Sequence, residues 1–284
     1  MKREVFYLVH VPKCAGTTVE HFAFTSLAPG EVFCPEKSWP INRFFLGKAW
    51  RRPSAIEPDQ VRVICGHYFG RACGHLLTPH TPLEALLIRD PVPLFLSWYN
   101  YRMARHERFG RPVPKFKDWY KSQGRNPIAR HVCTRHLGWS EAKFLVLKNS
   151  TIIEQLCSTL DSFWFIGDFR HVDRLLDAVG ERLNVKQDHE IRNVTQYKFL
   201  RRAELDGGLV EQIRRENAID GYLYGRYRDR LFDPAAVASV AEPLTGARLI
   251  RDELRRACAW ARIRKRQLRA RTTAALPVAV LGKG

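Results

Sequence analysis

EVFYLVHVPKCAGTTVEHFAFTSL, residues 4–27, is the stretch that decides the fold. Its apolar run from Val5 to Val11 is typical of a strand buried in a parallel sheet, and Pro12 should end that strand because proline cannot donate to a strand ladder. The spacing of apolar residues after the loop predicts a helix, with Thr17 or Thr18 as its N-cap. We therefore expect a strand, a short loop and a helix.

The loop Lys13-Cys14-Ala15-Gly16-Thr17-Thr18 has the composition of an anion site. Its residues are small, and the glycine would let the backbone approach a ligand closely. The positive end of the helix dipole and the charge of Lys13 both favour phosphate or sulfate. An ordinary capped turn is the alternative. The Walker pattern does not apply, because it needs lysine directly before the hydroxyl residue and here the lysine precedes the glycine.

Two further strands are predicted, at Val61–Cys65 and Glu84–Ile88. Gly66 and His67 follow the first of these strands, and Arg89 follows the second. Ligands of open α/β sheets bind beyond the carboxyl ends of the strands. We therefore expect His67 to face the loop of Lys13, although a lone histidine is more often structural than catalytic.

A second anion site is predicted around Arg89, whose planar guanidinium suits phosphate. A helical segment from Pro93 to His106 follows it, and Ser97 should lie near the start of that helix. The alternative is a surface pair of Arg89 and Asp90 ahead of an amphipathic helix. A ligand held by both anion sites must carry phosphate-like groups at both ends of a nucleoside.

Three strings, VPKCAGTT, CGHYFG and LLIRDPVPLFLSWYNYR, resemble motifs of sulfotransferases that use 3′-phosphoadenosine 5′-phosphosulfate (PAPS). The chain is most similar to the carbohydrate branch, which includes the heparan and uronyl 2-O-sulfotransferases and bacterial relatives. The resemblance covers about residues 4–232. It implies a P-loop NTPase-like α/β fold of three layers, with a central parallel sheet flanked by helices.

The resemblance also implies roles for single residues. His67 would be the catalytic base, and Lys13 would stabilise the leaving 5′-phosphate. Arg135 would bind substrate or contact the cofactor, with a structural ion-pair role as the alternative. It lies in a segment, HVCTRHLG, where His131 replaces the family's asparagine. His75 and His80 match no motif and are expected to be peripheral, and no metal is expected. The residues expected to bind the cofactor are Lys13, Cys14, Ala15, Gly16, Thr17, Thr18, Arg89, Ser97 and Thr195.

The rest of this region should be scaffold or acceptor site. Two loop regions, Gly30–Pro58 and Phe109–Arg130, are expected to shape the acceptor pocket, and the acceptor is expected to be a hydroxyl of a carbohydrate or glycoconjugate. Scaffold elements are predicted as a short helix at Phe116–Lys121, a helix at Ser150–Leu160, a strand at Phe163–Gly167, a helix at Asp168–Leu183 and a terminal helix at Glu211–Leu231.

Composition indicates a strongly basic protein with reduced thiols. Its 284 residues carry a net charge of +18, which favours anionic partners. The seven cysteines include no C-x-x-C pair, so reduced thiols are expected. The N-terminus lacks a signal-peptide pattern, which predicts a cytoplasmic protein. Residues 1–232 should form the sulfotransferase domain, and 233–284 a basic helical extension that contacts acidic membrane or polyanion, or merely packs on the domain.

Two other classes of protein remain as alternatives. A P-loop nucleotide kinase or NTPase would bind ATP with Mg²⁺, but it would need groups that hold the metal. A basic protein that binds nucleic acid or another polyanion would use the net charge of +18. No nucleic-acid-binding motif was found, so no nucleic acid partner is expected.

Overall fold

The fold is organised around one six-stranded sheet, seen in a computed structural model that describes residues 3–34, 57–67, 69–185 and 199–233. The strand order is β2-β3-β1-β4-β5-β6, and only the β5–β6 pair is antiparallel. The strands are β1 (Arg3–Val9), β2 (Val32–Phe33), β3 (Val63–Gly66), β4 (His80–Ile88), β5 (Phe165–Asp168) and β6 (Leu231–Phe232). The molecule is thus α/β with a mostly parallel mixed sheet.

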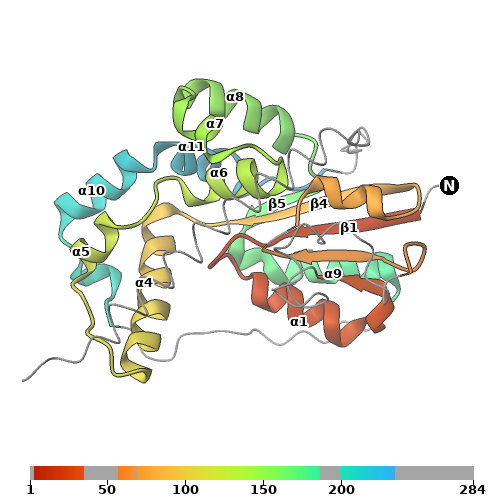
Figure 1. The fold of residues 1–284 in the computed structure, drawn as a ribbon, viewed down its shortest axis with the longest axis horizontal. Helices are drawn as coiled ribbons and strands as arrows, with labels where there is room; N and C mark the ends of the chain where they lie inside the picture. The colour runs from red at the N-terminus through yellow and green to blue at the C-terminus, as the bar shows by residue number, and fades with distance from the viewer. Residues whose placement is uncertain (1–2, 35–56, 68, 186–198, 234–284) are drawn as a thin grey trace, which may run out of the picture.

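Helices cover both faces of this sheet (Figure 1). On one face α1 (Gly16–Ser26) packs beside α9 (Val172–Leu183), and on the other lie α6 (Pro127–His131), α7 (Glu141–Val146), α8 (Asn149–Leu160) and α11 (Ala218–Tyr227). The strands between them are buried on both faces, which explains their continuous apolar runs.

A second group of helices lies beside the sheet and has its own core. It contains α4 (Pro91–Arg108), α5 (Phe116–Lys121) and α10 (Gly207–Glu216), grouped at one end of the molecule in Figure 1. Phe95, Tyr120 and Ile213 are fully buried in this core. The shorter turns are η1 (Pro29–Glu31), η3 (Arg71–Leu76), η4 (Val132–His136, a π-helix), η5 (Phe169–His171) and η6 (Arg202–Glu204).

The helix predicted at Glu211–Leu231 is wrong, because Asn217 divides it into α10 and α11. Asn217 has φ −119° and ψ 41°, outside the helical region. Its buried side chain donates to the Tyr120 hydroxyl at 3.0 Å and accepts from the Asn126 amide at 2.8 Å. These bonds to distant segments fix Asn217 in a conformation that interrupts the helix.

The observed ends of other elements differ from the predicted ends by a few residues. The predicted helix at Phe116–Lys121 is confirmed. β1 ends at Val9 rather than Val11, and β4 begins at His80 rather than Glu84, so His80 belongs to the sheet. A 3₁₀ turn precedes α9 where one longer helix was predicted. The predicted basic extension, apart from Asp233, lies outside the described residues.

Two expectations about the chain as a whole can be compared with the described residues. The six cysteines among them are all free thiols. In the same part of the chain, every helix is too short or too polar to cross a bilayer.

Candidate active site

The loops that follow three neighbouring parallel strands meet in one cavity. β1 lies between β3 and β4, so the segments after Val9, Gly66 and Ile88 leave the same edge of the sheet. A cavity of about 830 Å³ lies there, and Lys13, His67 and Arg89 all line it. The structure therefore brings together the three residues that follow these strands and that sequence analysis singled out.

The first loop has an unusual backbone. Lys13 and Ala15 have φ values of 69° and 60°, a left-handed conformation that is costly for residues other than glycine. α1 begins at Gly16 with Ala15 as its N-cap, and no side chain caps it. The predicted threonine cap is therefore wrong, because Thr17 and Thr18 already lie in the first turn. The amides of a first helical turn point toward the space before the helix, where this cavity lies.

Gly16 lines the large cavity and also has a packing role that the sequence did not predict. A Cβ atom at this position would overlap the ring of His10, which packs directly against the Gly16 Cα. The missing side chain thus makes room for a buried histidine beneath the loop. The loop can hold its shape around His10 only while residue 16 is glycine.

Arg89 lies at the centre of the second predicted anion site. Its guanidinium donates to the Lys13 carbonyl at 3.1 Å and lies 4.1 Å from the centre of the Phe169 ring. Among the described residues, its buried Nε has no hydrogen-bond partner. Burial and the neighbouring Arg89 lower the pKa of Lys13. Arg89 and Lys13 thus place positive charge side by side at the cavity, and anions bound there would offset it.

Ser97 faces the same cavity from α4. Asp90 caps this helix by accepting from the Val92 amide at 2.9 Å, and Pro91 occupies its first turn. The short path from Arg89 through the cap into α4 therefore sets Ser97 on the cavity wall. Trp98 and Tyr101 of the same helix also line the cavity, and the Lys13 ammonium lies 4.3 Å from the centre of the Tyr101 ring.

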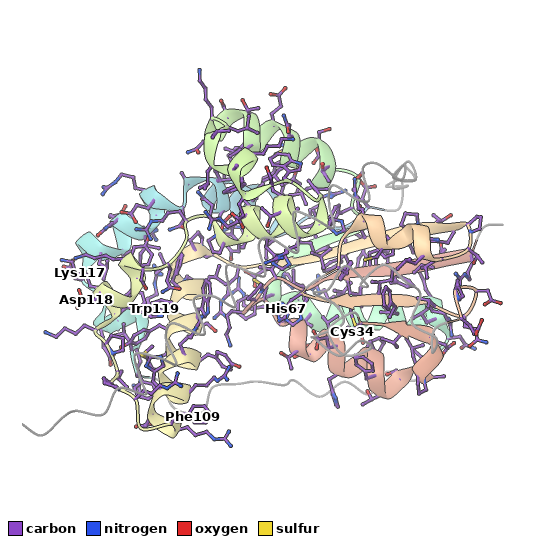
Figure 2. The ribbon with its side chains drawn as sticks, in the orientation of Figure 1. Cys34, His67, Phe109, Lys117, Asp118 and Trp119 are labelled. Carbon is purple, nitrogen blue, oxygen red and sulfur yellow. The ribbon has the colours of Figure 1, made fainter. Side chains whose placement is uncertain are left out.

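His67 is held in one tautomer by the main chain. Its Nδ1 lies 2.9 Å from the His10 carbonyl oxygen. A carbonyl only accepts, so Nδ1 carries the proton and Nε2 carries the lone pair of the neutral ring. Figure 2 shows His67 between the sheet and the α4 group. This tautomer suits a base that accepts a proton at Nε2.

His10 and Glu20 support His67 from below. The His10 ring lies against the His67 ring, with centroids 3.6 Å apart and the ring planes tilted by 34°, and His10 Nδ1 donates to the Glu20 carboxylate at 2.6 Å. Ligand atoms of the three residues lie within 4.8 Å of one another, close enough to be candidate ligands of a cation. Both Nδ1 atoms are already engaged, that of His67 with the His10 carbonyl and that of His10 with Glu20.

His131 and Arg135 line a second, smaller cavity of about 210 Å³. Pro12 and Trp98 line both cavities, so the two adjoin. The His131 ring lies 6.5 Å from the His67 ring. Burial, and then the nearby His67 and Arg135, hold the pKa of His131 well below its ordinary value. His131 therefore stays neutral beside the predicted base.

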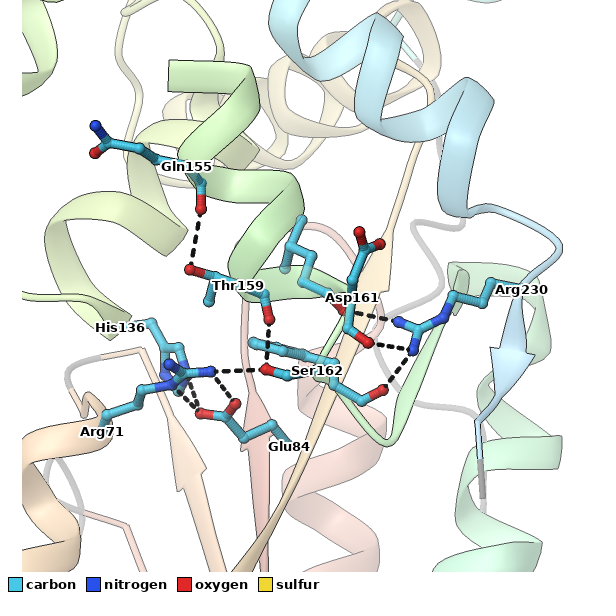
Figure 3. Close-up of polar contacts among 10 residues, drawn as sticks. Arg71, Glu84, His136, Gln155, Thr159, Asp161, Ser162 and Arg230 are labelled. Atoms are coloured by element: carbon cyan, nitrogen blue, oxygen red, sulfur yellow. Dashed lines mark hydrogen bonds and ion pairs between the residues drawn. The ribbon is translucent and has the colours of Figure 1, made fainter. Parts of the chain in front are cut away.

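A buried charge network anchors the segment that carries these two residues (Figure 3). Glu84, in the middle of β4, accepts from His136 Nε2 at 2.6 Å and from Arg71 Nε at 2.6 Å. Arg71 also reaches the Ser162 hydroxyl. Burial opposes ionisation of Glu84, but His136 and Arg71 outweigh it and lower its pKa. The network ties η4 to β4, which lies two strands away from β3 in the sheet.

Not every predicted residue reaches the large cavity. Cys14 is buried away from it, and its amide donates to the Val11 carbonyl. Arg135 lines only the smaller cavity of the two. Thr195 lies outside the described residues, as does most of Gly30–Pro58.

Sequence analysis missed His10 and Glu20, although both lie in the stretch that decided the fold. The available signal was a histidine at the end of an apolar strand and a glutamate on the helix that follows it.

A scan against protein-family models, a search of curated proteins and a search of solved structures found no match to this chain.

Proposed function

We propose that the chain is a PAPS-dependent sulfotransferase that transfers a sulfuryl group to a hydroxyl, most simply that of a carbohydrate or glycoconjugate. The observation that carries this proposal is that the two segments predicted as anion sites line one cavity. The loop of Lys13 would form one site, and Arg89 with Ser97 the other. PAPS carries phosphosulfate at the 5′ end of its nucleoside and phosphate at the 3′ end.

The cavity suits such a ligand in size and charge. Its volume of about 830 Å³ lies within the ordinary range for cofactor pockets. Among the described residues that line it are five cations, Lys13, Arg89, Arg170, Arg201 and Arg202, and one carboxylate, that of Asp173. The Arg89 guanidinium on the cavity wall is the kind of charged donor that pairs with phosphate oxygens.

The residues on the cavity wall match the needs of an in-line displacement. PAPS supplies the sulfuryl group and a 5′-phosphate leaving group. Lys13 and the first-turn amides of α1 would stabilise the charge that grows on the leaving phosphate oxygen as the bond from that oxygen to sulfur breaks. His67 Nε2 would accept the proton of the attacking hydroxyl as the new bond from oxygen to sulfur forms.

The P-loop NTPase-like part of the fold prediction belongs to this proposal. It is supported by β1, the loop of Lys13 and α1, which form a strand, loop and helix at the middle of a parallel sheet. It is also supported by the loop's left-handed residues, since such backbone is typical of anion-binding turns.

Two variants separate the proposed roles. Arg89→Ala should weaken binding of 3′-phosphoadenosine 5′-phosphate (PAP) by about 10- to 100-fold, because it removes charge-assisted bonds to a phosphate. His67→Ala should keep PAP affinity and lower sulfuryl transfer by about 10²–10⁴-fold, the usual effect of removing a general base. The measurements are PAP calorimetry and transfer of radiolabelled sulfate from PAPS to a panel of sugars. Equal loss of PAP affinity in both variants would sink this division of roles.

A further inference from the structure

The turn between α4 and α5 exposes apolar side chains among basic ones. Phe109 is 59% exposed and Val113 is 41% exposed. Figure 2 shows Phe109 at the end of α4 that lies furthest from the sheet. We call this surface the α4–α5 tip, formed by Arg105, Arg108, Phe109, Arg111, Val113 and Lys115.

Hydrogen bonds hold this turn in shape. The amides of Phe109 and Arg111 both donate to the His106 carbonyl, at 3.1 and 2.8 Å. The His106 ring donates from Nδ1 to the Pro112 carbonyl at 2.9 Å. Gly110, with φ 62°, supplies the left-handed residue that ends the helix. The exposure of Phe109 therefore belongs to a defined turn, so the ring needs little ordering before it contacts a partner.

Positive charge surrounds the exposed ring. Residues 105–115 contain four arginines and lysines against one carboxylate, Glu107. The guanidinium carbons of Arg108 and Arg111 lie 6.0 and 5.9 Å from the centre of the Phe109 ring. The tip thus presents an aromatic side chain between two cations.

We infer that the α4–α5 tip docks on an anionic lipid surface, with Phe109 and Val113 entering the interface and the basic side chains contacting headgroups. A soluble polyanion would use the arginines but gain nothing from two exposed apolar side chains. A lipid surface uses both, since apolar insertion and attraction to anionic headgroups add together in peripheral binding. This inference does not depend on the reaction proposed above.

The position of the tip would also orient the cavity. Ser97 at the cavity and Arg108 at the tip lie on the same helix. At 1.5 Å rise per residue they are about 16 Å apart along its axis. A docked tip would hold the large cavity close to the lipid surface.

The test is sedimentation of the full chain with vesicles of phosphatidylcholine alone or mixed with phosphatidylserine. We expect binding only to the mixed vesicles, weakening as salt rises. Phe109→Ser with Val113→Ser should lower the partition coefficient by about tenfold, through lost apolar burial. Arg108→Gln with Arg111→Gln should lower it by about 25-fold, since each basic residue near an anionic surface contributes about fivefold.

A matched control comes from α7, where Leu145 and Val146 are 65% and 79% exposed. Leu145→Ser with Val146→Ser should leave vesicle binding unchanged. The inference is overturned if neither tip variant weakens binding, or if the α7 control weakens it as much. It is also overturned if only the arginine variant matters and soluble heparin competes fully, because the tip would then bind a polyanion rather than a lipid surface.

Discussion

Gly16 and His10 show how single residues determine the geometry of the site. The His10 ring occupies the space that a side chain at position 16 would need, and the same ring lies against the His67 ring, with centroids 3.6 Å apart. The loop that holds Lys13 and the ring of the proposed base are therefore coupled through one buried imidazole.

Gly16→Ala tests this coupling. The new methyl group should displace His10 and cost about 1–3 kcal/mol of unfolding free energy, the usual effect of overpacking. Displacement of His10 should also disturb the loop and lower PAP affinity. Urea unfolding and PAP calorimetry measure the two effects. Ala15→Gly is the control, because Ala15 is already left-handed and glycine tolerates that conformation. Unchanged stability and affinity in Gly16→Ala would contradict the packing argument.

Glu20→Gln tests the electrostatic role of the buried carboxylate. Glutamine can still accept from His10 Nδ1, but the hydrogen bond to a charged carboxylate is lost. The free energy of unfolding, measured in urea, should therefore fall by about 1–2 kcal/mol.

An exposed carboxylate provides the comparison for that experiment. Glu154→Gln on α8 makes the same change in net charge at an exposed position and should leave the free energy of unfolding within about 0.5 kcal/mol of the wild-type value. Equal stability of Glu20→Gln and the wild type would contradict the electrostatic role of the buried carboxylate.

At the scale of elements, the short α6–η4 segment depends on distant anchors. α6 has only five residues, and its first amides, of Ile128 and Ala129, donate to the buried Asp220 carboxylate at 2.9 and 2.8 Å. At the other end, His136 is tied to Glu84 in the sheet. These two contacts hold His131 and Arg135 at the wall of the smaller cavity.

Glu84→Gln should destabilise the protein by about 3 kcal/mol at pH 7, because it leaves Arg71 and His136 without their buried counterion. The pKa of Glu84 is lowered in the folded state, so its stabilising effect should be full above about pH 4.3, the ordinary glutamate value, and should fade as the pH falls below it. The variant should lose this part of the pH dependence. Urea unfolding at several pH values measures the free energy of unfolding. If this free energy depends on pH in Glu84→Gln as it does in the wild type, another group is responsible for the pH dependence.

The sequence predicted elements where the signal was local. The apolar runs of β1, β3 and β4 and the motif order along the chain were enough to expect loops converging on one cavity, because parallel strands share an edge at their carboxyl ends. The break at Asn217 and the Glu84 network were not predictable, because each depends on partners far along the chain, such as Asn126 and His136. β2 and β6, with two residues each, are too short to give a periodic signal.

The candidate site residues likewise include some that the sequence predicted and some that it did not. Lys13 and Arg89 were found because charged residues directly follow apolar strands. His10 and Glu20 were missed because nothing in the spacing of a strand and its following helix shows that their side chains meet beneath a glycine.

At the scale of the whole molecule, the arrangement of charge connects the fold with the proposed chemistry. The chain carries a net charge of +18, and part of its positive charge lines the large cavity beside the sheet edge. A cationic cavity with low-dielectric walls attracts anions and raises their local concentration. Charge alone does not distinguish PAPS from ATP, however, so the nucleotide itself must be tested.

The most direct test of the central claim is calorimetric titration of the full chain with PAP, with ATP and Mg²⁺, and with 5′-AMP, in wild type and in Arg89→Ala. The account predicts tight binding of PAP, weak binding of the other two, and loss of the PAP preference in the variant, because only PAP occupies both anion sites. Equal or tighter binding of ATP with Mg²⁺ would contradict the account and favour a nucleotide kinase or NTPase.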